Sequence, residues 1–139
     1  MDILKRFKIL DRKEMATHMA LNLKLLCDAS SESIDATMYR QMIGSLMFLT
    51  NTRSYICFAM NTLSQFLTDP RDAQLVAAKD LLRYLKGTIE YGLKYETNQK
   101  INLHGYVDSD GEGSATNMKS TSRCCFSLGS NMISWFSRK

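Results

Sequence analysis

Apolar residues recur every three or four positions through the first part of the chain, a spacing that predicts amphipathic helices. Residues 2–10 form a first stripe, and a second helix is expected to begin near Asp35 or Thr37, either of which can cap it. A third helix is predicted over about 55–67. The stripes are Ile3, Leu4, Phe7 and Leu10; Met38, Met42, Leu46 and Leu49, widened by Ile43 and Met47; and Ile56, Met60, Leu63 and Leu67. These methionine-rich stripes are interpreted as core, not as a cofactor site.

The last helix of this part has clear boundary signals. Asp69 is predicted to be its N-cap, Pro70 its first residue and Gly87 the residue just past its end. Its buried stripe is expected to be Leu75, Ala78, Leu82 and Leu85. Gly44, inside the helix that begins near residue 35, costs about 1 kcal/mol relative to alanine, and we interpret it as a point of close approach by another backbone.

After Gly87 the pattern changes to the alternation that is typical of β-strands. Strands are predicted over 91–95, 102–108, 121–128 and 132–136, and Gly129-Ser130-Asn131 is typical of a hairpin turn between the last two. The polar stretch 27–33 is interpreted as a connection. The predicted fold class is therefore α+β, with a helical N-terminal half followed by an antiparallel sheet.

The composition is that of a globular domain: 45% of the 139 residues are hydrophobic and 23% are charged. The cysteines lack the spacing of a zinc site and are expected to be reduced thiols; they are Cys27, Cys57, Cys124 and Cys125. The first residues lack the apolar stretch of a signal peptide, and no segment has the roughly 20 apolar residues that span a bilayer. An intracellular setting, cytoplasmic or nuclear and without a membrane partner, is the expectation.

Two carboxylates stand at the end of a predicted strand. Asp108 and Asp110 are two residues apart, so they are expected to share one face. Carboxylates in this position can bind Mg²⁺, which prefers oxygen ligands. Two-metal hydrolysis of a phosphodiester typically needs about three or four carboxylates from separate elements. From the residues alone, a structural role for the pair is favoured over a metal site.

A basic stripe lies along the last predicted helix, where Lys79, Arg83 and Lys86 follow one another at helical spacing beside the apolar face. Phosphate binding through these residues would be sensitive to salt and indifferent to base sequence. The formal net charge of +4 permits such binding without indicating it. A solvated helix face is the competing interpretation, and the spacing alone favours it.

Several motifs occur in a fixed order along the chain. They include Leu82-Arg83-Tyr84-Leu85-Lys86-Gly87-Thr88 and Tyr106-Val107-Asp108-Ser109-Asp110, together with residues 39–50, 52–56, 61–64, 91–93, 119–122 and 133–135. In this order they resemble the Pol polyprotein of copia-type LTR retrotransposons, at the junction between reverse transcriptase and RNase H. The resemblance covers nearly the whole chain.

The resemblance implies two domains. Residues 1–95 would be similar to the helical thumb and connecting region of reverse transcriptase, and residues 101–139 to the first strands of RNase H, as an incomplete sheet. It gives Asp108 the position of the first catalytic aspartate, a Mg²⁺ ligand in the family. Asp110 is a candidate ligand only because it shares a strand face with Asp108. The helices that carry the basic stripe would flank a primer–template duplex, such as an RNA–DNA hybrid.

The sequence also departs from the family pattern. The remaining carboxylates of the polymerase and RNase H sites are not among the 139 residues, which end at Lys139. The family's Asp-Trp-Ala-Gly is replaced by residues 110–113, its Pro-Asp by Ser54-Tyr55, and a common glycine by Arg123. We therefore expect a truncated Pol fragment that has no catalytic activity and no cofactor as an isolated chain, and that retains at most nucleic-acid or Mg²⁺ binding.

Two other functions stay open. One is RNase H-type, Mg²⁺-dependent hydrolysis of RNA in RNA–DNA hybrids, if further sequence or a partner chain completes the site. The other is a domesticated protein-interaction module that uses residues 35–90. An apolar sheet face is also expected to be left open, which predicts self-association. Its candidate members are Val107, Phe126, Ile133 and Trp135.

Overall fold

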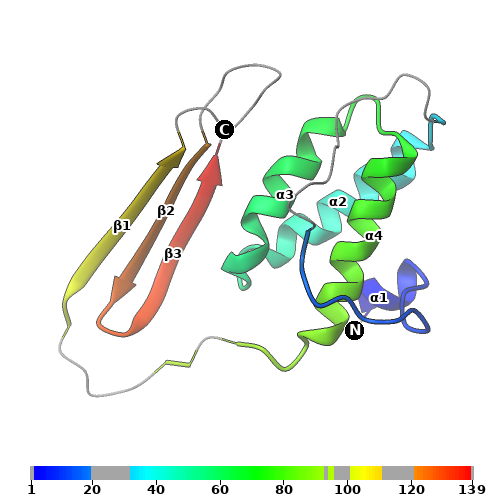
Figure 1. Ribbon diagram of the computed structural model, residues 1–139. Coiled ribbons are helices and arrows are strands. Elements are labelled where there is room, and N and C mark those ends of the chain that lie inside the picture. The colour runs from blue at the N-terminus through cyan, green and yellow to red at the C-terminus, as the bar shows by residue number, and fades with distance from the viewer. Residues whose placement is uncertain (1, 20–31, 93, 96–100, 111–120, 139) are drawn as a thin grey trace. The chain divides into compact units, whose positions relative to one another are not determined.

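The chain divides into two compact units, Met1–Tyr91 and Gly92–Lys139. The computed structural model describes residues 2–19, 32–92, 94–95, 101–110 and 121–138. Helices make up the first unit and a sheet the second, which confirms the predicted α+β class (Figure 1). The assignment of the units to a reverse-transcriptase thumb and to RNase H stays a prediction. Among the described helices, none is long and apolar enough to cross a membrane.

The helical unit is built from short segments. They are α1 (Asp2–Arg6), α2 (Ala36–Leu49), η1 (Ser54–Ile56), α3 (Cys57–Leu63), η2 (Ser64–Phe66) and α4 (Asp72–Gly87), of which η1 and η2 are 3₁₀ turns. The helix predicted over 55–67 is thus three consecutive pieces, because both ends of α3 tighten into 3₁₀ geometry. The helix predicted over 2–10 ends at Arg6, and Lys8 then adopts a φ of 55°, which right-handed helices exclude.

Helix α2 begins where the sequence predicts. Asp35 is its N-cap, and its Oδ1 accepts a hydrogen bond of 2.8 Å from the backbone N–H of Thr37. The interpretation of Gly44 is wrong. Gly44 lies on the exposed side of α2, and a Cβ atom built there would meet nothing within 4 Å. The glycine therefore lowers helix propensity without allowing any close packing.

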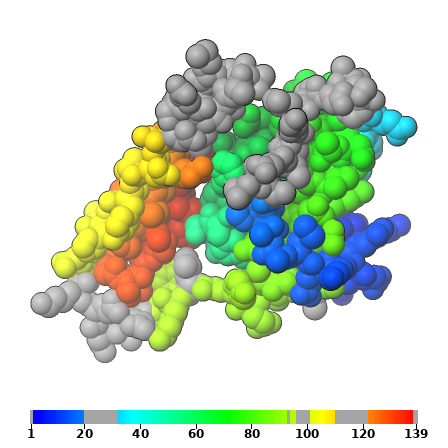
Figure 2. Space-filling model, in the orientation of Figure 1, coloured from blue at the N-terminus to red at the C-terminus, as the bar shows by residue number. Residues whose placement is uncertain are grey.

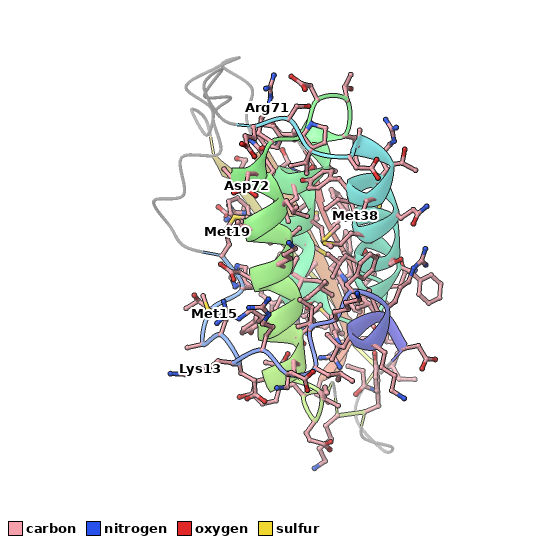
Figure 3. The ribbon with its side chains drawn as sticks, turned by 90° about the vertical axis from the view of Figure 1, so that its right-hand side faces the viewer. Lys13, Met15, Met19, Met38, Arg71 and Asp72 are labelled. Carbon is pink, nitrogen blue, oxygen red and sulfur yellow. The ribbon has the colours of Figure 1, made fainter. Side chains whose placement is uncertain are left out.

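The predicted start of α4 is also wrong, since the helix begins at Asp72 with Arg71 as its N-cap (Figure 3). Arg71 instead forms an isolated antiparallel bridge with Ser33, and the Pro70 carbonyl accepts a 3.5 Å hydrogen bond from Ile34. This pairing holds Arg71 in an extended conformation, so the helix begins at Asp72 and not at Pro70. At the other end Gly87 is the last helical residue and not the first one beyond the helix.

Helices α2, α3 and α4 pack on one another around the core of the unit. Its buried members are Leu4, Ile9, Tyr39, Met42, Ile43, Leu46, Ile56, Ala59, Met60, Leu63, Leu75, Ala77, Ala78, Leu81, Leu82 and Leu85. The stripe predicted for α4 is entirely buried, which confirms it. Met47, predicted to widen the stripe of α2, is exposed and lies outside the buried face of that helix.

Tyr39 is the largest polar group in this core. Its hydroxyl donates a 2.9 Å hydrogen bond to the carbonyl of Leu63, and the side chain is fully buried. Removing the hydroxyl in Tyr39→Phe should lower the free energy of unfolding by about 1–2 kcal/mol at neutral pH, because the carbonyl loses a buried donor. Urea denaturation of the two proteins measures this difference.

The same residue should make the unit sensitive to alkali. Burial raises the pKa of Tyr39 well above its usual value, which is about 10. The unfolded chain therefore releases this proton first, and the free energy of unfolding should fall above pH ~10 by up to about 1.4 kcal/mol per pH unit. Tyr39→Phe should make the alkaline slope of the free energy of unfolding against pH shallower by the equivalent of one proton. An unchanged slope would contradict the assignment of this slope to Tyr39.

The sheet unit contains β1 (Leu103–Asp110), β2 (Thr121–Leu128) and β3 (Asn131–Arg138), all antiparallel in the order β1-β2-β3. The three corresponding sequence predictions are confirmed, and Gly129 takes the positive φ of 62° that the hairpin turn requires. The strand predicted over 91–95 is wrong for its described residues. Tyr91 instead donates a 3.0 Å backbone hydrogen bond to Thr88, which continues the turn after α4.

The apolar residues predicted to form one open face of the sheet lie on both of its faces. Cys124 and Cys125 are neighbours in β2 and so point to opposite sides. Val107 is paired with Cys124, whereas Trp135 is paired with Cys125. Val107 therefore shares a face with Phe126, and Trp135 lies on the other. Self-association through one continuous apolar face stays a prediction.

Candidate functional site

The Asp108 carboxylate has a cationic partner from the neighbouring strand. Asp108 in β1 lies directly opposite Arg123 in β2, and Arg123 Nη1 is 3.2 Å from Asp108 Oδ2. The two side chains are 70% and 43% exposed, respectively. An ion pair that is this exposed contributes only about 0–1 kcal/mol to stability. Its consequence is electrostatic: the carboxylate already lies beside a positive charge.

The described residues do not fit a two-metal Mg²⁺ site. Asp108 supplies one carboxylate, and its neighbour in the fold is a guanidinium and not a second acid. Asp110 is paired in register with Thr121, but its side chain lies outside the described ones, so its predicted role as a ligand stays a prediction. Within the described residues, no three His, Cys, Asp or Glu side chains are grouped as metal ligands are. One carboxylate beside a cation is too few ligands for two Mg²⁺ ions.

Two members of the basic stripe on α4 contact the N-terminal segment. Arg83 Nε donates a 2.6 Å hydrogen bond to the carbonyl of Lys13, and its Nη1 lies 2.8 Å from Asp80 Oδ1. Lys86 Nζ donates a 3.0 Å hydrogen bond to the carbonyl of Arg12. Lys79 is exposed. Nucleic-acid binding by these three residues stays a prediction. Arg83 and Lys86 donate hydrogen bonds to the N-terminal segment, whereas Lys79 faces solvent.

Residues 8–19, which we call the strap, follow α1 and lie along α4. Figure 2 shows the blue N-terminal residues on the surface beside the green residues of α4, and Figure 3 shows Lys13, Met15 and Met19 along the helix. Met19 packs against the core, and the His18 ring makes an edge contact with Tyr84 at a centroid distance of 5.8 Å. Ile9, near the other end of the strap, is buried in the core, so both ends of the strap are attached to the helical unit.

Sequence reasoning missed the strap. Its hydrogen bonds to α4 use the backbone carbonyls of Arg12 and Lys13, and every residue type offers such a carbonyl. Glu14 gives the one weak signal, since its carboxylate lies 3.9 Å from Lys86 Nζ. A single acidic residue more than 70 positions before its partner in sequence does not identify a contact.

The chain is similar to polyproteins of mobile elements. The retrovirus-related Pol polyproteins from transposons RE2 and RE1 of Arabidopsis thaliana are each 37% identical to it over 139 residues, which is all of this chain. The chain belongs to the retrovirus-related Pol polyproteins of transposons. It spans about a tenth of the length of those two relatives.

This Pol segment also has a much shorter relative. Secreted RxLR effector protein 161 of Plasmopara viticola is 37% identical over 102 residues, which is 73% of this chain and 72% of that protein. No protein-family model matches the chain, and no solved structure matches it. The family is thus shown by sequence relatives, whereas the fold is described by the structure alone.

One residue of the motifs in this Pol segment has a structural role. Arg53, in the stretch 52–56, donates hydrogen bonds to the carbonyls of Thr88 and Ile89 at 2.8 and 3.3 Å. It also donates to the hydroxyl of Tyr55. The guanidinium therefore caps the C-terminal end of α4, where the helix dipole favours a positive charge.

Tyrosines surround this cap. Tyr55 and Tyr84 meet edge to face at a centroid distance of 5.8 Å. Burial raises the pKa of Tyr84, and the neighbouring Tyr55 and Tyr91 raise it further, against the opposing effect of Arg53. The phenol therefore stays neutral at physiological pH, as expected for a packing residue and not for a catalytic base.

The described cysteines are not in disulfides. Cys57, Cys124 and Cys125 are free thiols, and Cys27 lies outside the described residues. Burial raises the pKa of the Cys57 thiol, so less thiolate forms at neutral pH. A low reactivity toward alkylating reagents follows for Cys57.

Proposed function

We propose that this chain is a segment of a copia-type Pol polyprotein that contacts the phosphate backbone of nucleic acid through its helical unit and does not hydrolyse it alone. Membership of the Pol family supports the contact with nucleic acid. The ion pair between Asp108 and Arg123 is the observation that carries the proposed absence of hydrolysis. Both statements concern the isolated chain.

The argument against hydrolysis is one of charge and ligand number. Arg123 gives the Asp108 carboxylate one full positive charge at 3.2 Å. A divalent ion on the same carboxylate would lie beside that guanidinium, and like charges at such distances repel each other. Within the described side chains, no further carboxylate is placed to offset this repulsion. The residues therefore support a structural ion pair better than a metal centre.

The argument for backbone contact rests on exposed cations. Lys79 on α4 and the strap residues Arg12 and Lys13 are all exposed. Lysine and arginine bind phosphates by charge-assisted hydrogen bonds that do not depend on base sequence. The affinity should therefore fall steeply with salt and differ little between duplexes of unrelated sequence.

One pair of assays tests both parts. A labelled RNA–DNA hybrid incubated with the chain and Mg²⁺ should stay intact, and Asp108→Asn should give the same result. In a parallel titration the hybrid should bind, and log Kobs should fall linearly with log salt concentration. Mg²⁺-dependent cleavage that disappears in Asp108→Asn would refute the proposal, as would the absence of binding at low salt.

RNase H-type hydrolysis in a longer protein is the second candidate function. The observation that favours it is that the chain spans about a tenth of the length of the RE2 and RE1 polyproteins. The rest of such a protein has room for the carboxylates that the described residues lack. The same hybrid assay on a longer Pol product separates this candidate from the first: cleavage by the longer product alone would support completion of the site.

A further inference from the structure

We propose that the strap forms part of the nucleic-acid surface: Arg12, Lys13 and Lys79 contact the phosphate backbone of a duplex, whereas Arg83 and Lys86 are positioning residues that hold the strap. This inference rests on the proposed nucleic-acid binding and specifies its residues. It changes the assignment that the sequence suggests, in which Lys79, Arg83 and Lys86 all bind phosphate.

The hydrogen bonds of Arg83 and Lys86 are directed at the strap. Their nitrogen atoms donate to the carbonyl oxygens of Lys13 and Arg12 at 2.6 and 3.0 Å. A phosphate oxygen would need these same donors, so it would compete with the strap for them. With the strap in place, a duplex meets the outer side of the strap before it meets these two side chains.

Acidic side chains also lie beside the two positioning residues. Asp80 lies 2.8 Å from Arg83, and Glu14 lies 3.9 Å from Lys86, so each positioning cation has a carboxylate beside it. These carboxylates weaken the attraction of Arg83 and Lys86 for a second anion. The two residues are therefore suited to hold a neutral backbone segment, not to receive a phosphate.

The remaining cations on this side of the unit have no such neutralisation. Arg12 and Lys13 are exposed, and within the described part of the chain neither side chain has an ion-pair partner. Figure 3 shows the side chain of Lys13 pointing away from α4. Lys79 lies four residues before Arg83, one helical turn from the point at which Lys13 docks. Each of the three cations has an acidic neighbour in sequence: Asp11, Glu14 and Asp80. The carboxylates of Glu14 and Asp80 lie beside Lys86 and Arg83.

A salt titration of the full chain with a labelled RNA–DNA hybrid tests the surface. Arg12→Gln/Lys13→Gln should make the slope of log Kobs against log salt shallower by about 2, and Lys79→Gln by about 1. The matched control is Lys5→Gln/Arg40→Gln, which removes the same charge from exposed positions on α1 and α2. Because those helices lie outside the proposed surface, the control should keep the slope of the unmodified chain.

Three results decide the outcome. A slope that changes in the strap variant but not in the control supports the inference. Equal changes in both double variants, or no change in the strap variant, would overturn the inference and leave nucleic-acid binding intact. A chain that does not bind the hybrid at low salt overturns the proposed function and this inference together.

Trypsin cleavage after Arg12 and Lys13, followed by mass spectrometry, tests the positioning role of Arg83. Arg83→Leu removes the donor to Lys13, so cleavage in the strap should become faster, and Arg83→Lys should restore part of the protection. A hybrid added to the unmodified chain should slow the same cuts. If Arg83→Leu makes the salt slope shallower by about 1 without changing strap cleavage, Arg83 contacts phosphate directly, and its assignment as a positioning residue is wrong.

Discussion

Leu82→Ala should lower the free energy of unfolding of the helical unit by about 3–4 kcal/mol. Leu82 lies at the centre of α4 with 0% of its surface exposed, among side chains from several helices. The loss combines the transfer free energy of the missing methyl and methylene groups with the cavity that they leave. Since small domains are stable by only about 5–15 kcal/mol, this single change should remove a large part of the total.

Val76→Ala is the matched control for this change. Val76 is on the same helix but 47% exposed, and alanine has the higher helix propensity, so its effect should stay within about 0.5 kcal/mol. Urea denaturation followed by far-ultraviolet circular dichroism measures both. Equal effects of the two substitutions would mean that α4 is not packed through the face that carries Leu82.

The helical core was predictable because its signal is local. Periodic apolar residues define a face within a single helix, and Leu75, Ala78, Leu82 and Leu85 are buried as their spacing predicts. The cap at Asp35 was predictable for the same reason, since it depends on the backbone two residues away. Strands β2 and β3 are joined by a short turn, so their pairing also follows from the local sequence.

Two of the failures of sequence-based prediction arise where distant segments meet. Asp69 and Pro70 carry strong start signals, yet pairing between Ser33 and Arg71 delays α4 until Asp72. The docking of the strap on α4 likewise depends on residues that are far apart in sequence. Tertiary contacts of this kind override local propensity. The sequence of one helix does not reveal them, because the partner lies in a distant segment.

The candidate site shows the same limit. Asp108 and Arg123 both stood out in the sequence, but nothing in it placed them opposite each other. Their pairing depends on the register between β1 and β2, and a slip of one residue would move Arg123 to the other face of the sheet. The connection between these strands is long, so no tight turn fixes that register. The structure thus adds an ion pair to Asp108 that the sequence did not predict, whereas the role of Asp108 as a metal ligand stays a prediction.

The motif residues therefore have different kinds of roles. Arg53 holds the end of α4, Arg83 holds the strap, and neither points its donors only into solvent. A basic residue in a motif of a nucleic-acid enzyme is readily interpreted as a phosphate ligand, yet both of these donate to backbone carbonyls of their own unit. Exposure and hydrogen-bond partners together distinguish the two roles, and neither can be obtained from spacing.

Arg53→Leu should be the second strongly destabilising change, with a loss of about 2–3 kcal/mol in the free energy of unfolding. The substitution leaves the carbonyls of Thr88 and Ile89 without their charged donor and removes the positive charge at the C-terminal end of α4. Arg40→Leu is the control, because Arg40 is exposed and makes a single 3.3 Å hydrogen bond to Leu67. Its effect should stay below about 1 kcal/mol.

A double-mutant cycle with Tyr55→Phe tests whether the cap acts as one network. The Tyr55 hydroxyl accepts from Arg53 and lies 3.4 Å from the Thr88 hydroxyl, so removing it should matter less once Arg53 is gone. We expect a coupling energy of about 1 kcal/mol between the two substitutions, measured by urea denaturation of all four proteins. Additive effects would show that Arg53 holds α4 through the carbonyls alone, and that the tyrosine contributes only by packing against Tyr84.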